Sequence, residues 1–192
     1  MSLLLHAEGL VAGWQGPATP SLDLQVAAGE IVGLAGPNGV GKTTLLAAIA
    51  GRAQVFAGRL TIAAGVRLAL QTQEVPPVAG LPLAGRELLA LTGATAEGLP
   101  PWLAERLDCR LDRLSGGQRH YLTLWAVLAA PAELILLDEP TNNLDAAGGV
   151  HLSQTLRQRA ATGAGILVVS HDAEFVAAVC QRTLVLEAHD VV

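Results

Sequence analysis

The chain alternates short apolar runs with segments whose apolar residues recur at helical spacing. Runs of four or five residues rich in Leu, Ile and Val indicate buried strands, and the segments between them indicate helices covering both faces of a sheet. The predicted strands are 22–26, 31–35, 59–62, 67–71, 134–138, 166–170 and 183–187. The predicted helices are 43–50, 85–91, 102–107, 116–129, 150–160 and 173–180. This alternation predicts an α/β fold with a mostly parallel sheet.

One segment, 75–101, differs from the rest because it is rich in Pro, Gly and Leu. It is typical of an insertion on the core rather than a part of the sheet. A chain of 192 residues fits one domain. We therefore expect a single domain, 1–192, with a core of 1–73 and 130–192 and a helical insertion at about 74–129. The most apolar stretch, 121–137, is interrupted by Pro131 and Glu133, which indicates a buried helix and strand rather than a membrane span.

Composition narrows the possible partners. Hydrophobic residues make up 51% of the chain and charged residues 15%, so some apolar surface is expected to meet a partner. The net charge of −5 gives no electrostatic footprint for nucleic acid, and no nucleic-acid partner is expected. The two cysteines have no metal-ligand spacing, and the N-terminus lacks the basic region of a signal peptide. These features favour a cytoplasmic protein.

The only lysine of the chain, Lys42, lies in a glycine-rich stretch that matches the phosphate-loop pattern G-x-x-x-x-G-K-[ST]. The stretch follows a predicted strand and opens a predicted helix, so backbone N–H groups and the helix N-terminus would converge on phosphate. The alternative is an ordinary glycine-rich turn. Lys42 would contact the β- and γ-phosphates, and the Thr43 hydroxyl would bind Mg²⁺. The candidate nucleotide-binding residues here are Gly36, Pro37, Asn38, Gly39, Val40, Gly41, Lys42, Thr43 and Thr44.

A second motif typical of nucleotide binding is ELILLDEP, which contains the predicted strand 134–138. Asp138 would emerge at the carboxyl end of the strand, where ligands bind in open α/β sheets. It can hold Mg²⁺ there, and the adjacent Glu139 can polarise an attacking water. The alternative is a buried strand that ends in an acidic turn.

A third signal is LSGGQ, at the start of the predicted helix 116–129. Ser115 followed by Gly116, Gly117 and Gln118 would leave N–H groups free to bind an anion. A simple capped helix start is the alternative, since Ser is a preferred N-cap.

In this order, the motifs GPNGVGKTT, LSGGQ, LILLDEPT, NNLD and VVSHD resemble an ATP-binding cassette (ABC) ATPase domain over nearly the whole chain. The resemblance implies a P-loop NTPase (RecA-like) core, a small antiparallel β subdomain and a short helical insertion. It also implies ATP and Mg²⁺ as ligands and an active ATPase.

The resemblance assigns further roles. Trp14 resembles the aromatic that stacks on adenine, although a strand-end Trp is the alternative. Gln73 resembles the glutamine that reaches Mg²⁺ and the attacking water, with Gln71 as its competitor. Glu139 resembles the catalytic base. Asp145 resembles the aspartate that couples two active sites, and His171 the histidine that contacts the γ-phosphate.

The family pairs the phosphate loop of one copy with LSGGQ of another, which implies a head-to-tail dimer or a paired ABC subunit with ATP between the copies. The chain also departs from the family pattern. Where a basic residue and an alanine–arginine pair usually follow LSGGQ, it has Tyr121, Trp125 and Ala126. The predicted helix is therefore almost wholly apolar, and the basic contacts usual there are missing or replaced.

Three classes of ABC protein are possible, and they differ in the process that ATP hydrolysis drives. A transporter subunit would dock its insertion, 75–91, on a membrane permease at the inner face of the cell membrane. The run 65–91 is similar to the zinc/manganese importer subfamily, although its leucines could simply pack on the core. PTNNLD and VVSHDAEF resemble soluble ABC proteins that act on ribosomes or other assemblies, but those usually carry two cassettes. A DNA-repair cassette would need a coiled-coil insertion. We favour the transporter subunit, with a metal ion as the imported cargo.

Overall fold

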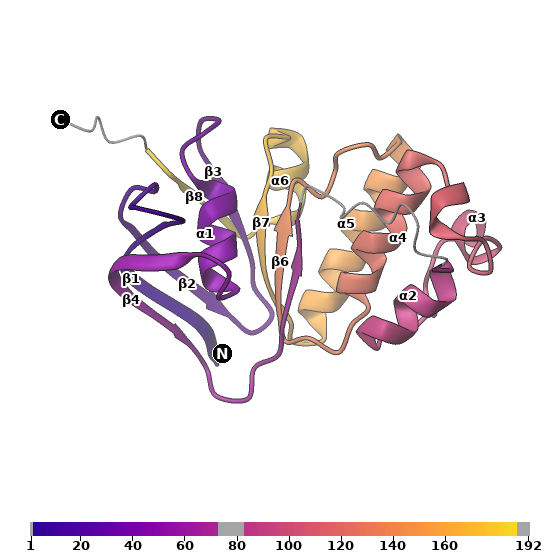
Figure 1. Ribbon diagram of the computed structural model, residues 1–192, viewed down its shortest axis with the longest axis horizontal. Helices are drawn as coiled ribbons and strands as arrows, with labels where there is room; N and C mark the ends of the chain where they lie inside the picture. Colours follow the sequence, from indigo (N-terminus) through magenta and orange to yellow (C-terminus); the bar gives the residue numbers. More distant parts are fainter. Residues whose placement is uncertain (1, 73–82, 188–192) are drawn as a thin grey trace.

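The computed structural model describes residues 2–72 and 83–187. Two sheets organise it (Figure 1). The antiparallel sheet has the order β2-β1-β4, with β1 at Leu3–Gly13, β2 at Leu22–Ala27 and β4 at Gln54–Ile62. The parallel sheet has the order β5-β6-β7-β3-β8, with strands Leu68–Gln71, Leu134–Asp138, Gly165–Val169, Ile31–Ala35 and Arg182–Val185. The predicted α/β fold with a parallel sheet and a small antiparallel sheet is confirmed.

Helices fill the space on both sides of the parallel sheet. Helix α1 (Lys42–Ile49) lies between the two sheets, where its leucines join a core with β1, β3 and β6. On the opposite face, α4 (Gly116–Leu128), α5 (Ala146–Ala161) and α6 (Ala173–Val179) cover the same sheet. Helices α2 (Gly85–Thr92) and α3 (Pro101–Ala104), with a 3₁₀ turn at Leu111–Arg113, pack on the outer side of α4. Figure 1 shows them at the end of the molecule farthest from the antiparallel sheet.

One strand was not predicted, and three predicted elements have a bound that differs from the observed one by three or more residues. The strand β1 was missed altogether: its buried and exposed positions do not alternate strictly, because register shifts interrupt its pairing with both neighbouring strands. Strand β4 begins at Gln54, not at 59, since its first residues pair with the end of β1. Helix α5 begins at Ala146, not at 150, because the Asp145 side chain accepts a hydrogen bond from Gly148 N and offsets the low helix propensity of two glycines. Helix α3 ends at Ala104, three residues before 107.

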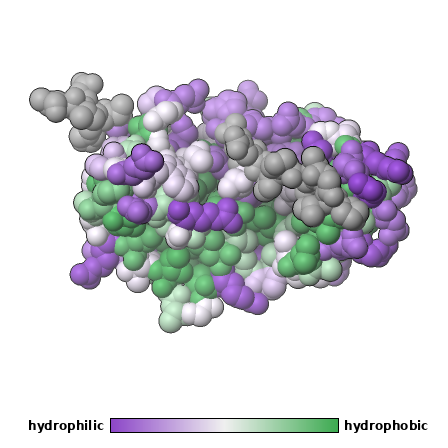
Figure 2. All heavy atoms as spheres, viewed as in Figure 1, coloured by the Kyte–Doolittle hydropathy of each residue, from purple (hydrophilic) through white to green (hydrophobic). Residues whose placement is uncertain are grey.

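The surface is uneven in polarity. Figure 2 shows apolar side chains across the lower middle of one face, with polar ones along the upper rim and at the helical end. Exposed large apolar side chains include Phe56 on β4, Leu91 on α2 and Trp102 on α3. Among residues 2–72 and 83–187, no helix combines the length and the apolar character that a membrane crossing requires.

Candidate functional site

The phosphate loop joins strand β3, which lies between β7 and β8, to helix α1, as the sequence predicts. Gly41 ends the loop with φ +100°, a backbone conformation that glycine adopts without strain. A Cβ on Gly41 would lie 2.6 Å from Thr19 Cγ2 and 3.1 Å from Ala18 O. The loop after β1 therefore presses against the phosphate loop, and both the backbone conformation and the packing require glycine at this position.

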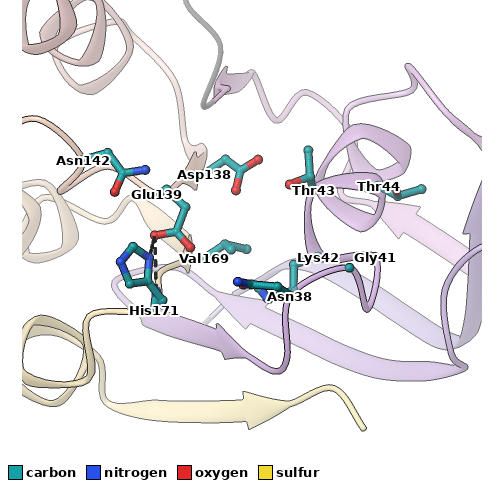
Figure 3. A pocket seen from close by; sticks show the side chains of 11 residues that line it. Asn38, Gly41, Lys42, Thr43, Thr44, Asp138, Glu139, Asn142, Val169 and His171 are labelled. Carbon is teal, nitrogen blue, oxygen red and sulfur yellow. Dashed lines mark hydrogen bonds and ion pairs between the residues drawn. The ribbon is translucent and has the colours of Figure 1, made fainter. Parts of the chain in front are cut away.

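Lys42 is nearly buried and its ammonium group lies over its own loop. Lys42 Nζ donates hydrogen bonds to Gly36 O at 2.8 Å and to Pro37 O at 2.9 Å. These carbonyls hold the charge at the mouth of a cavity of about 480 Å³ lined by loop and strand-end residues. Figure 3 shows Lys42 at this cavity together with Asp138, Glu139 and His171. An anion bound by the loop would replace the two carbonyls as the partner of this charge.

Asp138 ends β6 and faces the same cavity. It is 1% exposed, and neither carboxylate oxygen has a hydrogen-bond partner by distance and angle among the described residues. Burial raises the pKa of this carboxyl group, and the neighbouring Thr43 hydroxyl and Lys42 charge oppose that rise. An ionised carboxylate buried without a full set of partners is suited to bind a cation.

Glu139 follows directly and adopts a positive φ of 51° while its backbone N–H donates to Val169 O at 2.8 Å. One carboxylate oxygen, Oε2, lies 2.7 Å from His171 Nδ1 and accepts a bond from His171 N at 3.2 Å. Figure 3 marks this contact between the ends of β6 and β7. The His171 side chain is 70% exposed and that of Glu139 12%, so the histidine covers the carboxylate from the solvent side.

The cavity thus brings together most of the predicted catalytic residues, which come from three separate strand ends. It is lined by Asn38, Gly39, Gly41, Lys42, Thr43, Thr44, Asp138, Glu139, Asn142, Val169 and His171. Asn142 was not predicted as a site residue. Its position within PTNNLD, between two predicted site residues, is the signal that would have identified it.

Two further predicted residues are Trp14 and Gln73. Trp14 follows β1 and is 57% exposed, and it does not line the cavity, so adenine stacking stays a prediction. Gln73 lies outside the described residues. Its competitor Gln71 is buried, with its amide donating to Thr72 O at 2.8 Å and accepting from Asp138 N at 3.2 Å. The Gln71 side chain thereby supports the backbone at the end of β6.

The LSGGQ segment lines a different cavity, of about 330 Å³. Ser115 caps α4: its hydroxyl accepts from Gln118 N at 3.2 Å, and Gln118 Oε1 accepts from Ser115 N at 3.1 Å. Gly117, Gln118 and Asp145 line the same cavity, the last as the cap of α5. The predicted residues therefore divide between two cavities of one chain. The phosphate loop and the acidic edge share one, whereas LSGGQ and Asp145 share the other.

Comparison with known proteins finds ATP-binding subunits of ABC transporters. A family model described as "ABC transporter" matches residues 20–78. A zinc import ATP-binding protein ZnuC of Marinobacter nauticus is 34% identical over 179 residues, which cover 90% of this chain and 70% of the relative. The ZnuC of Cereibacter sphaeroides is 37% identical over 175 residues, covering 88% and 72%.

Solved structures give the same result. The ATP-binding subunit of an ABC transporter superposes with a TM-score of 0.83 at 26% identity, covering 96% of this chain and 86% of the other. An RNase-L inhibitor superposes with a TM-score of 0.79 at 25% identity, but only 38% of that chain is covered.

Proposed function

Because the chain belongs to the family of ATP-binding subunits of ABC transporters, and so is an ATPase that works with a membrane permease, we propose that it powers metal-ion import. The zinc import proteins among its relatives support zinc or a chemically similar divalent ion as the cargo. The subunit would then lie at the cytoplasmic face of the cell membrane, held there by its permease.

One observation carries the proposed mechanism: the two groups of nucleotide residues line separate cavities. Lys42 and Glu139 line one, and Ser115 and Asp145 line the other. A single nucleotide in one chain would meet only the first group. We therefore propose that two copies, or this chain and a paired subunit, assemble head to tail so that Ser115 of one completes the site of the other. The capped start of α4 is suited to this role because its free N–H groups attract the γ-phosphate.

In the proposed site, ATP phosphates bind the loop 36–44, and Lys42 exchanges the carbonyls of Gly36 and Pro37 for phosphate oxygens. Glu139 accepts the proton of the attacking water as general base. His171 holds the Glu139 carboxylate through Nδ1, and its exposed ring lies at the cavity, where it can contact the γ-phosphate. Trp14 would stack on the adenine ring.

The residues present also fit a magnesium ion. Asp138 offers two buried carboxylate oxygens, neither of which accepts a hydrogen bond of normal length and angle from a described residue. The Thr43 hydroxyl lines the same cavity. Such oxygen ligands are the ones that magnesium prefers. We propose Thr43, Asp138 and Gln73 as its ligands, the last from outside the described residues. Bound there, the ion would neutralise charge on the β- and γ-phosphates.

The proposed permease contact involves the insertion that precedes α3. Leu91 on α2 is 74% exposed, and a large apolar side chain this exposed is suited to pack against a partner. The remainder of the predicted contact, 75–82, lies outside the described residues. The alternative, a soluble protein acting on ribosomes, is not favoured, because the relatives above are transporter subunits.

A complementation experiment tests the head-to-tail site. Lys42→Ala removes the phosphate ligand of one cavity. Ser115→Asp keeps a good N-cap but places a carboxylate where the partner's phosphate is proposed to bind. Each variant alone should lose hydrolysis. An equimolar mixture should recover about a quarter of the wild-type rate, because half of the dimers would contain one intact site of two.

A mixture no more active than its components would contradict the head-to-tail site. Three further experiments address the dimer and the transporter. Glu139→Gln should still bind ATP and accumulate as a dimer in size-exclusion chromatography. Tagged Glu139→Gln, isolated with ATP from detergent-solubilised cells, should retain a multi-span membrane protein, and cells carrying only Lys42→Ala should lose uptake of radioactive zinc. Ribosomal proteins in place of a membrane protein would contradict the transporter proposal.

A further inference from the structure

An aromatic cluster replaces the basic residues that the family usually has in α4. Tyr121 is completely buried, and its ring packs edge-on against Trp102 of α3, with centroids 5.4 Å apart. On its other side lies His151 of α5, at 5.8 Å and an interplanar angle of 60°. Trp125, one turn farther along α4, also contacts His151 and donates a hydrogen bond from Nε1 to Thr95 O at 2.8 Å. The cluster therefore joins α3, α4 and α5.

Its centre is a hydrogen bond between Tyr121 Oη and His151 Nδ1, at 2.5 Å. The hydroxyl of Thr155 lies 3.5 Å from the same nitrogen but donates its proton to His151 O at 2.9 Å. Among the described residues Nδ1 is the one hydrogen-bond partner of Tyr121 Oη, so the buried hydroxyl has an acceptor for its proton only if it donates to Nδ1. Burial raises the pKa of the Tyr121 phenol, which keeps that proton in place at neutral pH.

The position of this bond relates it to the two capped helix starts. Tyr121 lies six residues after Ser115, the N-cap of α4, and His151 lies six residues after Asp145, the N-cap of α5. Each residue of the bond therefore lies about 9 Å along its helix from the N-cap. A Cβ on Gly148 would lie 3.7 Å from Tyr121 Cδ2, so the ring also packs on the first turn of α5.

From this geometry we infer that Tyr121 and His151 form a positioning pair that fixes the starts of α4 and α5 relative to each other. Ser115 and Asp145 can then meet the nucleotide of a second copy as one rigid surface. The inference rests on the proposed head-to-tail site. Tyr121 also lines the cavity of Ser115 and Asp145, but it is completely buried and its hydroxyl bonds His151, so we expect the pair to act through the two helices rather than by contact with the nucleotide.

The test uses Tyr121→Phe, which removes the hydroxyl and keeps the ring, in the Glu139→Gln background. ATP-driven dimerisation is measured by analytical ultracentrifugation, and binding of a fluorescent ATP analogue to the monomer is measured alongside. We expect the dimer dissociation constant to rise about fivefold to tenfold, because each of the two protomers loses one buried hydrogen bond and only the part of that loss that misplaces the two helix starts reaches the interface. Monomer affinity for the analogue should change less than about twofold, since Lys42 lies in the other cavity.

Three companion variants separate positioning from stability. His151→Leu should weaken the dimer like Tyr121→Phe, and the double variant should be no worse than either single one, because both remove the same contact. His151→Asn places an acceptor oxygen near the Nδ1 position and should restore part of the loss. Thr123→Val is the control: it removes a hydroxyl from α4 whose bond, to His120 O at 2.8 Å, stays within that helix. Dimerisation of this variant should match the parent.

The outcomes distinguish the inference from its premise. If the Glu139→Gln parent itself stays monomeric with ATP, the head-to-tail site is refuted and the positioning pair with it. If the parent dimerises and Tyr121→Phe dimerises equally well, the positioning pair alone is refuted, whatever happens to the unfolding temperature. Failure of His151→Asn to improve on His151→Leu would also contradict the inference, because the hydrogen-bond acceptor would then not matter.

Discussion

Without nucleotide, Asp138→Asn should be more stable than the wild type. ATP and magnesium should then stabilise the variant less than they stabilise the wild type. In the folded protein, both carboxylate oxygens are buried and lack a geometric hydrogen-bond partner among the described residues. Replacing the charge by a neutral amide removes part of a desolvation penalty, although the amide is also incompletely bonded. We expect a net gain of about 1–2 kcal/mol in the free energy of unfolding at neutral pH. For a chain of this size the melting temperature would rise by about 2–8 °C.

The effect of magnesium and ATP should have the opposite sign. At a concentration one hundred times its dissociation constant, a ligand that binds only the folded state stabilises it by about 2.7 kcal/mol. If the variant binds the magnesium complex about one hundredfold more weakly, the same concentration contributes only about 0.4 kcal/mol. Thermal melts with ATP plus magnesium, and with ATP plus EDTA, measure both quantities. The variant should therefore have the higher melting temperature without ligand, and the wild type the higher one with ATP and magnesium.

The pH dependence gives an independent check. Burial raises the pKa of Asp138 in the folded state above its unfolded value. The folded protein therefore binds this proton more tightly than the unfolded chain, and the stability it contributes is lost as pH rises through the raised pKa. The advantage of Asp138→Asn should be largest above that pKa and shrink as the pH falls.

A matched control variant and two possible results test the burial of the Asp138 carboxylate and its binding of magnesium. Asp112→Asn changes an exposed carboxylate that lies 2.6 Å from Arg110, and it should leave the melting temperature unchanged or lower it. If Asp138→Asn is less stable than the wild type without nucleotide, the Asp138 carboxylate is satisfied in the folded protein and the burial argument is wrong. If magnesium and ATP stabilise both proteins equally, Asp138 does not hold the ion.

Two further predictions concern packing, the first away from the nucleotide cavity and the second within it. Arg159→Met should lower the free energy of unfolding by about 2 kcal/mol, because two carbonyls after α4, Ala130 O and Ala132 O, lose the guanidinium that binds them at 3.2 and 2.8 Å. Urea unfolding measures this loss, and an unchanged midpoint would show that water replaces the guanidinium without cost. Gly41→Ala should weaken ATP binding at least tenfold, since its φ of +100° and the Thr19 contact at 2.6 Å both oppose a side chain. Titration with a fluorescent ATP analogue measures it, with Gly39→Ala, which meets no atom within 4 Å, as the comparison for backbone strain alone.

Local patterns were sufficient for much of the fold. Strands β3 and β6 lie at the predicted residues because both are continuous apolar runs buried on both faces. Strand β1 was missed because it pairs with two distant strands, and its bulges near Gly9 interrupt the simple alternation of a strand. Helix α5 was predicted too short because its start depends on one side-chain cap rather than on apolar periodicity.

The candidate nucleotide site could likewise be predicted from the sequence alone. A phosphate loop needs its glycines, lysine and threonine within a few consecutive residues, because adjacent backbone groups bind one phosphate chain. Asp138, Glu139 and His171 end predicted strands, and parallel strands bring their carboxyl ends to one edge. Such contiguous motifs determined the family and the ATPase activity.

Only the tertiary structure decided how these pieces meet. The division of the predicted residues between two cavities depends on where α4 and α5 pack, which no single segment specifies. The same is true of the bond from Tyr121 to His151, two residues that are thirty positions apart and have no shared motif. The contact between Glu139 and His171, across thirty-two positions, is set by the neighbouring ends of β6 and β7. Side-chain partners separated by whole elements follow from packing in three dimensions, and linear spacing does not encode that packing.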